Sequence, residues 1–171
     1  MIWERIGPGQ VLLGMESETS EEILCALGAA LVASGACRES YPEALSRREE
    51  ESPTGLDMDG FGIALPHTDP SHVISPALAI GVPLRPARFT AMGMDDEQVE
   101  ARVVCALALN DPAAHLDFVE ALLEIFRDRG VLESLAGASS AEEVIAVIRD
   151  REAAGLETAR ASAPDGGGKE S

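Results

Sequence analysis

Residues 99–109 read VEARVVCALAL, an apolar run that carries charge only near its start. Every second residue from Val99 to Leu109 is apolar, which predicts that Ala101 and Val103 lie on one face of the strand. The other face becomes apolar from Val104 onward. A strand with apolar side chains on both faces is typical of the centre of a sheet that is covered on both sides. We therefore predict a central strand here, and a fold in which helices cover a sheet.

A helix start follows this strand directly. Asp111 supplies an N-cap and Pro112 a first-turn proline, a favoured way to begin a helix. The apolar stripe of this helix is formed by Leu116, Val119, Leu123 and Phe126. We expect Gly130 to end the helix.

Helices are also expected toward the N-terminus. Thr19 and Glu22 have the spacing of a capping box, and the helix that they begin would end near Gly35. Ser40 opens a shorter helix that runs to about Glu50.

Two short strands are predicted between these helices and the central strand. Residues 52–60 are rich in turn residues and predict a loop. Alternating apolar side chains then indicate one strand at 61–65 and another at 78–82. Together with the helices, they predict an α/β fold with a mixed sheet of about five strands flanked by helices on both faces.

The C-terminal part contains a last helix and a tail. Ser139 and Glu142 would cap this helix. Its apolar stripe is formed by Val144, Val147 and Ile148. Beyond about Ala153 the sequence turns to Ala, Gly, Ser and charge, so we expect a domain over 1–153 and a disordered acidic, Gly-rich tail over 154–171.

The composition excludes several classes of partner. The 171 residues carry a formal charge of −17, which repels nucleic acids and anionic membrane surfaces. No apolar run approaches the roughly 20 residues that span a bilayer, and no signal peptide is visible, so we expect no membrane insertion. No nucleotide-binding glycine motif occurs, and no cofactor is expected.

The three cysteines show no metal-type spacing. Cys25 and Cys105 fall inside apolar stretches, and we expect both to be small buried hydrophobic residues. An odd set of free thiols, which includes Cys37, suits the reducing cytoplasm, where we place the protein.

Three histidines, His67, His72 and His115, are the candidates for chemistry. A neutral imidazole is a nucleophile at physiological pH. His67 follows a predicted strand end, and His115 falls in the first turn of a predicted helix, where the helix dipole favours an anion. This pattern indicates a cradle for a phosphoryl group. The alternatives are that His67 is an ordinary surface or capping residue and that His115 only packs beside Leu116 and Val119.

A second hypothesis is a metal-dependent hydrolase. His67, Asp69 and His72 are types of residue that bind zinc or manganese. Prolines at 66, 70 and 76 prevent the segment from placing these ligands on one regular helix. A plain turn capped by Asp69 fits the segment better, so we assign no metal.

Two motifs resemble one known family. Residues 48–55, REEESPTG, followed by GIALPH at 62–67, resemble the active-site signature of enzyme IIA of the sugar phosphotransferase system (PTS), fructose/mannitol type (type 2). That signature is an arginine and glutamate, a threonine, then G-[IF]-A-[IL]-P-H. The segment NDPAAHL at 110–116 is similar to the surroundings of the family's second histidine. The resemblance covers about residues 10–150 and implies a sandwich like that of mannitol enzyme IIA.

The resemblance implies a phosphotransferase with defined partners. His67 would accept a phosphoryl group from the phosphohistidine of HPr and donate it to a cysteine or histidine of an enzyme IIB, which works with the membrane permease, enzyme IIC. His115 would hydrogen-bond the phosphoryl oxygens, Arg48 would neutralise them, and Thr54 would order the adjoining loop. A regulatory module of the same fold, whose phosphorylation state a partner reads, is the alternative.

The residues after His67 indicate a branch of the family. The mannitol and fructose branches usually have glycine directly after the active histidine, whereas Thr68 and Asp69 follow here. The run P-H-T-D is similar to the galactitol branch, which implies a sugar or polyol as cargo. A carboxylate at Asp69 would repel a phosphohistidine, so we expect it to orient an imidazole N–H instead.

Overall fold

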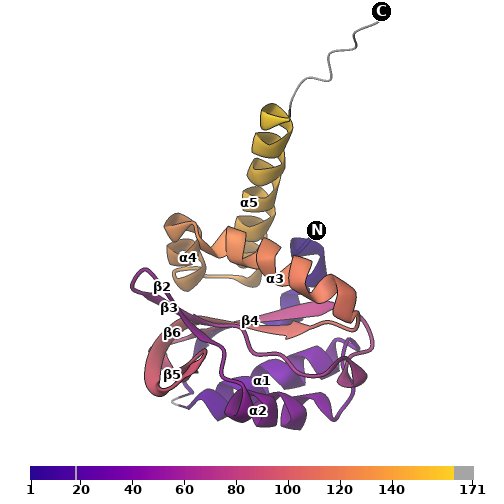
Figure 1. Cartoon of the computed structure of the whole chain (residues 1–171), viewed down its shortest axis with the longest axis vertical. Coiled ribbons are helices and arrows are strands. Elements are labelled where there is room, and N and C mark those ends of the chain that lie inside the picture. Colours follow the sequence, from indigo (N-terminus) through magenta and orange to yellow (C-terminus); the bar gives the residue numbers. More distant parts are fainter. Residues whose placement is uncertain (18, 164–171) are drawn as a thin grey trace, which may run out of the picture.

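A computed structural model describes residues 1–17 and 19–163, and in it a mixed sheet separates two layers of helices (Figure 1). This architecture confirms the α/β prediction, with six strands in place of about five. The strands are β1 (Val11–Met15), β2 (Gly55–Met58), β3 (Phe61–Ala64), β4 (Ala77–Pro83), β5 (Ala87–Ala91) and β6 (Met94–Ala108). The helices are α1 (Ser20–Ala33), α2 (Tyr41–Glu51), α3 (Pro112–Phe126), α4 (Arg129–Ala136) and α5 (Ala141–Ser162).

The predicted central strand, β6, organises the sheet. The strand order is β1-β4-β6-β3-β2-β5, and β5 pairs with β6 as well, so that β6 pairs with three other strands. It runs parallel to β3 and antiparallel to β4 and β5. Parallel pairing brings the carboxyl ends of β3 and β6 to the same edge of the sheet, and both histidine segments follow these two ends.

A bulge in β6 changes which face its side chains cover. Gly62 of β3 pairs with Ala101, whereas the next residue, Ile63, pairs with Val103, so β6 contains one extra residue. Val103, Cys105 and Leu107 then pack on the face covered by α3, α4 and α5, while Ala101 packs on the face covered by α1 and α2. The sequence prediction that Ala101 shares a face with Val103 is therefore wrong.

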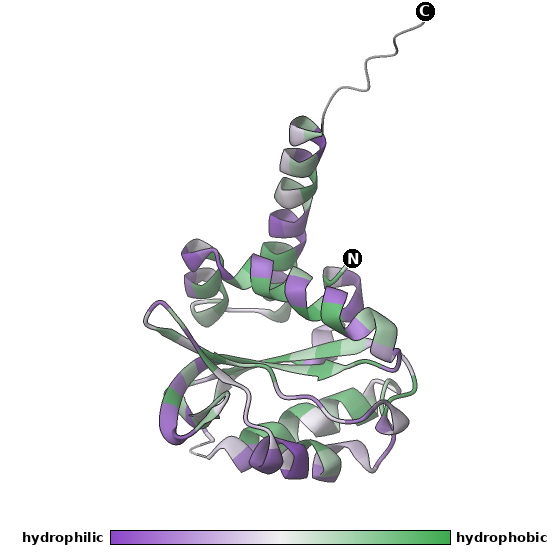
Figure 2. Cartoon of the chain, in the orientation of Figure 1, coloured by the Kyte–Doolittle hydropathy of each residue, from purple (hydrophilic) through white to green (hydrophobic). Residues whose placement is uncertain are grey.

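Apolar residues on both faces of the sheet form two cores. The α1 and α2 face contains Leu24, Leu27 and Tyr41, and the opposite face contains Leu122, Phe126 and other side chains of the C-terminal helices. In Figure 2 the middle of the sheet and the inward helix sides are hydrophobic, while the outward sides of the helices and parts of the curved β5–β6 region are hydrophilic. Burial on two faces agrees with the doubly apolar pattern of residues 104–108.

Three strands lie where none was predicted. Within the expected loop at 52–60, residues 55–58 form β2, and Asp59 and Gly60 turn the chain with φ of 51° and 89°. This Asp-Gly turn is a standard hairpin signal that the sequence contained. β1 and β5 are the others, and each has only five residues.

The helix ends differ from the predictions in three places. α3 ends at Phe126, and Gly130 lies in the first turn of α4 instead of ending α3. The N-cap of α5 is Ser140, whose hydroxyl accepts from the backbone N–H of Glu143, one residue later than expected. α5 continues to Ser162, so residues 154–162 are helical; the expected disorder of 164–171 lies outside the described residues.

Two predictions of burial are also wrong. Cys25 is exposed on α1, while Cys105 is buried as expected. Leu116, which the stripe of α3 was expected to bury, is 64% exposed. It lies in the first turns of α3, before the part of the helix that buries Leu122 and Ile125. Within the described ranges, no helix has both the length and the apolar character to cross a bilayer.

Candidate functional site

His67 lies directly beyond the end of β3, against the end of β6. It forms an isolated parallel bridge with Leu107, whose backbone N–H donates to the carbonyl oxygen of Pro66 (2.9 Å). The buried hydroxyl of Tyr41, at the start of α2, donates to the carbonyl oxygen of the same Leu107 (2.8 Å). The position of His67 therefore depends on β3, β6 and α2 together.

His115 faces His67 from the first turn of α3. The centroids of the two rings are 5.0 Å apart, and the ring planes meet at 51°. Asp111 caps this helix, because its Oδ1 accepts from the backbone N–H of Ala113 (2.9 Å). The pairing arises because β3 and β6 are parallel and each histidine follows the end of one strand. The structure thus brings together two of the residues that the motifs singled out.

The hydrogen bond of His67 determines which ring nitrogen is free. Nδ1 lies 2.9 Å from the carbonyl oxygen of Leu65, two residues earlier. A carbonyl oxygen only accepts, so Nδ1 carries the hydrogen and donates. The lone pair of the neutral ring is then on Nε2, which is the nitrogen able to act as a nucleophile.

Partial burial acts on the second imidazole. It lowers the pKa of His115, and the nearby charge of a protonated His67 lowers it further. A lowered pKa keeps His115 neutral near pH 7. A neutral imidazole can still donate one N–H to an anionic oxygen.

Arg48, near the end of α2, lies beside the loop that follows His67. Its Nη1 donates to Oδ1 of Asp69 (3.2 Å), and its Nε is buried with no hydrogen-bond partner in the described part of the chain. Asp69 therefore pairs with Arg48, while the Nδ1–H of His67 goes to Leu65. We expected Asp69 to orient an imidazole N–H, but in the structure its carboxylate binds Arg48 instead.

Thr54 is buried, 2% exposed, and is bound to a carboxylate on α2. Its backbone N–H and its hydroxyl both lie within hydrogen-bond distance of Glu49, at 2.8 Å and at 2.9 and 3.1 Å. No function was assigned to Glu49 from the sequence, although Glu49 is the glutamate that follows Arg48 in the motif at residues 48–55. Its burial depends on how α2 packs on the sheet, which no local pattern indicates.

His72 does not join the two facing histidines as a metal ligand. Its Nδ1 lies 2.8 Å from the hydroxyl of Ser40, at the N-cap of α2. Across residues 1–17 and 19–163, no group of three or more His, Cys, Asp and Glu side chains is arranged to hold a metal ion. The geometry therefore does not support the set His67, Asp69 and His72 as a metal centre.

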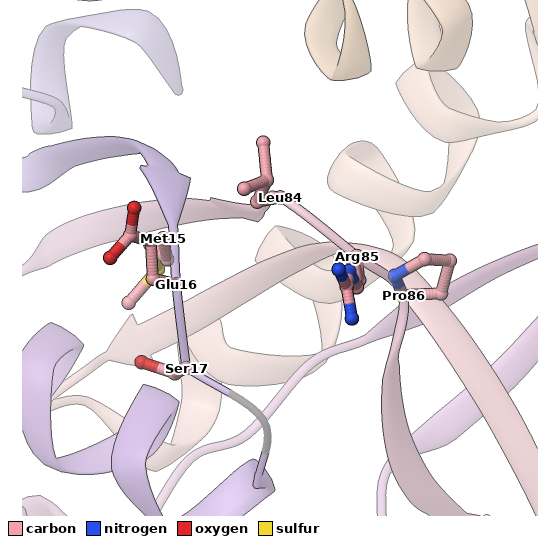
Figure 3. Close-up of a pocket in the computed structure, with 6 residues that line it drawn as sticks. All are labelled: Met15, Glu16, Ser17, Leu84, Arg85 and Pro86. Carbon is pink, nitrogen blue, oxygen red and sulfur yellow. The ribbon is translucent and has the colours of Figure 1, made fainter.

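A separate hollow lies at the other end of β4. It has a volume of about 390 Å³ and is lined by Met15, Glu16, Ser17, Leu84, Arg85 and Pro86 (Figure 3). Leu107, the bridge partner of His67, pairs with Leu78 near the start of β4, whereas Leu84 follows the end of that strand. The hollow and the histidine pair are thus separated by the length of β4.

Residues 6–151 match the model of one family, described as "Phosphoenolpyruvate-dependent sugar phosphotransferase system, EIIA 2". The chain belongs to this family. Enzyme IIA components are phosphotransferases that pass a phosphoryl group by way of a histidine, and this general phosphocarrier role is that of the chain. The family resemblance inferred from the motifs at 48–67 and 110–116 is confirmed.

Individual relatives agree with the family. The galactitol-specific EIIA component of Escherichia coli is 29% identical over 122 residues, which cover 71% of this chain and 81% of that protein. Among solved structures, enzyme IIAMTL in its complex with phosphorylated enzyme IIBMTL from Escherichia coli has a TM-score of 0.70 at 26% identity, over 85% of this chain and 97% of that one. The nitrogen regulatory protein IIA-Ntr of Neisseria meningitidis has a TM-score of 0.68 at 25% identity, over 86% of this chain and 98% of that chain.

Proposed function

We propose that this enzyme IIA accepts a phosphoryl group from phospho-HPr on Nε2 of His67 and passes it to an enzyme IIB partner in the cytoplasm. The observation that carries the proposal is the hydrogen bond from Nδ1 of His67 to the Leu65 carbonyl, which leaves the Nε2 lone pair free beside His115. In the transfer, this lone pair forms a bond to phosphorus while the N–P bond of the donor phosphohistidine breaks. The donor imidazole leaves with that electron pair and takes up a proton.

The surrounding side chains suit a phosphoryl group. Phosphoryl transfer needs mainly positioning and charge neutralisation from the protein. His115 donates an N–H to a phosphoryl oxygen, and the partly exposed guanidinium of Arg48 supplies a positive charge. Thr54 holds the loop between β2 and α2 through its contacts with Glu49. Chain 1–153 forms the working domain, which agrees with the family match to residues 6–151.

The cargo of the proposed pathway is a sugar or polyol of the galactitol type. The sequence P-H-T-D around His67 supports this branch, and a galactitol-specific EIIA component is among the relatives of the chain. The enzyme IIB partner would work with a membrane enzyme IIC. A solved complex of an enzyme IIA relative with a phosphorylated enzyme IIB supports the IIB contact.

The assignment is tested by incubating the protein with phosphoenolpyruvate, enzyme I and HPr and mapping acid-labile phosphate by mass spectrometry. We expect label on His67, none in His67→Ala, and unchanged labelling in His72→Ala, because His72 contacts Ser40 instead. His115→Ala is expected to accept phosphate but to transfer it onward poorly. Label on another residue, or label that persists in His67→Ala, would contradict the proposal.

A regulatory role is the second candidate, and the likeness to IIA-Ntr favours it. In that case the phosphorylation state of His67 would control a partner protein. Mixing the phosphorylated protein with a galactitol-type enzyme IIB separates the two functions. Rapid loss of phosphate from His67 to the IIB protein supports transport, and a phosphate that stays on His67 supports regulation.

A further inference from the structure

Glu49 is a buried carboxyl group whose hydrogen bonds all go to one residue of the active-site loop. Its exposed fraction is 8%, and it is one of only three buried polar residues in the described ranges, with Gln10 and Thr54. Burial raises its pKa to about 7, although the hydrogen bonds from Thr54 oppose this effect. Burying a carboxyl group costs free energy unless the group is hydrogen-bonded, and Thr54 supplies the hydrogen bonds of Glu49.

Hydrogen bonds continue from this pair to the imidazole of His67. Glu49 accepts from the backbone N–H and the hydroxyl of Thr54, and the carbonyl oxygen of Thr54 accepts from the N–H of Leu65 (3.4 Å). The carbonyl oxygen of Leu65 then accepts from Nδ1 of His67 (2.9 Å). The N–H and the carbonyl group of Leu65 belong to consecutive peptide groups, so Thr54 holds the backbone of Leu65 directly before the carbonyl group that binds the His67 ring. The position of that acceptor, and with it the tautomer of His67, therefore depends on where Thr54 is held.

The neighbouring residue of α2 acts on the other side of His67. Arg48 pairs with Asp69, which lies two residues after His67. Leu65, which accepts from the ring of His67, lies two residues before it. Consecutive residues of α2 thus contact both flanks of His67, one directly and one through Thr54. The hydroxyl of Tyr41, on the same helix, donates to the carbonyl oxygen of Leu107 in β6, the strand that His67 lies against.

We propose that Glu49 is a positioning residue, which acts through Thr54 and Leu65 to hold His67 in the tautomer that leaves Nε2 free. The proposal rests on the proposed phosphoacceptor role of His67, but it concerns the ring itself and can be tested without phosphate. Glu49 touches neither the phosphoryl group nor its donor. Its effect is to keep the lone pair on Nε2 of His67 and to hold the ring in position for the transfer.

Nitrogen-15 NMR of the histidine rings at a pH where His67 is neutral tests the tautomer directly. In the wild type we expect one tautomer, with hydrogen on Nδ1. In Glu49→Ala we expect a mixture of both tautomers, and a fall of about tenfold or more in the rate of phosphoryl transfer to His67, as for other small misplacements of reacting groups. Glu49→Gln keeps a carbonyl acceptor for the N–H of Thr54. We expect this variant to keep mainly the wild-type tautomer and most of the wild-type rate of phosphoryl transfer.

Glu50→Ala is the matched control, because Glu50 is an exposed glutamate at the next position of the same helix. It is expected to keep the wild-type tautomer and rate. If Glu49→Ala does not fold, Thr54→Val decides, since it removes the hydroxyl contacts with Glu49 and keeps the backbone N–H. A partial shift toward both tautomers in Thr54→Val supports the proposal.

A wild-type tautomer and rate in folded Glu49→Ala, or in Thr54→Val when the alanine variant is unfolded, would overturn the positioning role. This outcome differs from failure of the proposed function. If wild-type His67 takes no phosphate but its tautomer changes in Glu49→Ala, the positioning role stands and the phosphoacceptor role falls. If His67 is phosphorylated and the tautomer does not respond, the reverse holds.

Discussion

The ion pair between Arg48 and Asp69 bears on how a phosphoryl group could be received. Both side chains are partly exposed, 39% and 66%, and exposed ion pairs contribute about 1 kcal/mol or less. Arg48 can therefore turn from Asp69 to a phosphoryl oxygen at small cost. A carboxylate that leaves the guanidinium also adds negative charge near the phosphate, and this repulsion makes the phosphorylated state easier to discharge.

Glu49 makes the stability of the fold depend on pH. Its pKa is raised from 4.5 to about 7, so its contribution to stability is fully present below about pH 4.5 and is lost as the pH rises through 7. We expect the free energy of unfolding of the wild type, relative to Glu49→Gln, to fall between these values by up to about 1.4 kcal/mol per pH unit. Urea denaturation of both proteins from pH 4.5 to 8 measures it, and a constant difference would contradict the shift.

Among the structural elements, β3 and β6 approach each other so closely that there is no room for a side chain at Gly62. At its bulge, a Cβ atom on Gly62 of β3 would lie 2.0 Å from the backbone oxygen of Glu100, which cannot move without breaking the sheet. Gly62 is also the first residue of the GIALPH motif. The glycine of that motif therefore has a structural reason, which is the close approach of two strands immediately before the histidine segment.

Gly62→Ala is expected to lower the free energy of unfolding by about 2 to 3 kcal/mol, because the added methyl group overlaps backbone atoms. Gly9→Ala is the control, since a Cβ atom there meets nothing within 4 Å, and we expect a change of about 0.5 kcal/mol or less. Chemical denaturation measures both. Equal stability of the two variants would show that β3 and β6 can separate at the bulge.

The N-terminal segment is attached to α5 by one carboxylate. Oε1 and Oε2 of Glu152 accept from the backbone N–H groups of Ile2 (2.8 Å) and Trp3 (3.0 Å). Ile2 is buried and belongs to the core that α5 covers. Residues 1–5 and Glu152 both lie outside the 6–151 match to the family, so this contact joins the two ends of the domain.

Removal of that carboxylate in Glu152→Ala is expected to destabilise the fold by about 1 to 2 kcal/mol, because two backbone donors lose a charged acceptor. The fluorescence of Trp3, the single tryptophan, should also shift as the segment loosens. Thermal unfolding and emission spectra test both effects. Glu157→Ala, an exposed change on the same helix, should alter neither, and an unchanged Trp3 spectrum in Glu152→Ala would argue that Ile2 alone holds the segment.

On the scale of the whole chain, the last turns of α5 stand away from the sheet (Figure 1). Val144 and Ile148 are buried in the core, whereas residues 153–163 are exposed apart from the partly buried Gly155. The domain therefore completes its core before residue 153, even though the helix continues. Helical structure beyond the core follows from local propensity and contributes no packing.

A chain truncated after Ala153 is expected to fold, because it retains Ile148 and the Glu152 contact. We expect its Tm to lie within about 3 °C of the full chain, a difference of roughly 1 kcal/mol. Calorimetry of the two chains measures this, and phosphoryl transfer to His67 should proceed at the same rate in both. A large fall in Tm or in the rate would mean that residues 154–171 contribute to the domain.

Local patterns were sufficient for the elements with strong end signals and long apolar periods. The apolar run at 99–109 predicted β6, Thr19 predicted the start of α1, and Asp111 with Pro112 predicted the start of α3. The motifs at 48–67 and 110–116 were sufficient for the family. In each case the signal lies within a few neighbouring residues, so it could be read along the chain.

Other features exist only because distant segments meet. The 5.0 Å approach of His67 and His115 requires β3 to pair in parallel with β6, and the burial of Glu49 requires α2 to pack on the sheet. The bulge that turns Ala101 to the other face is likewise a property of two strands together. Pairing between segments depends on the summed packing of the whole chain. The residue types alone therefore determined which functional groups the protein has, and the tertiary structure decided which of them lie together in one site.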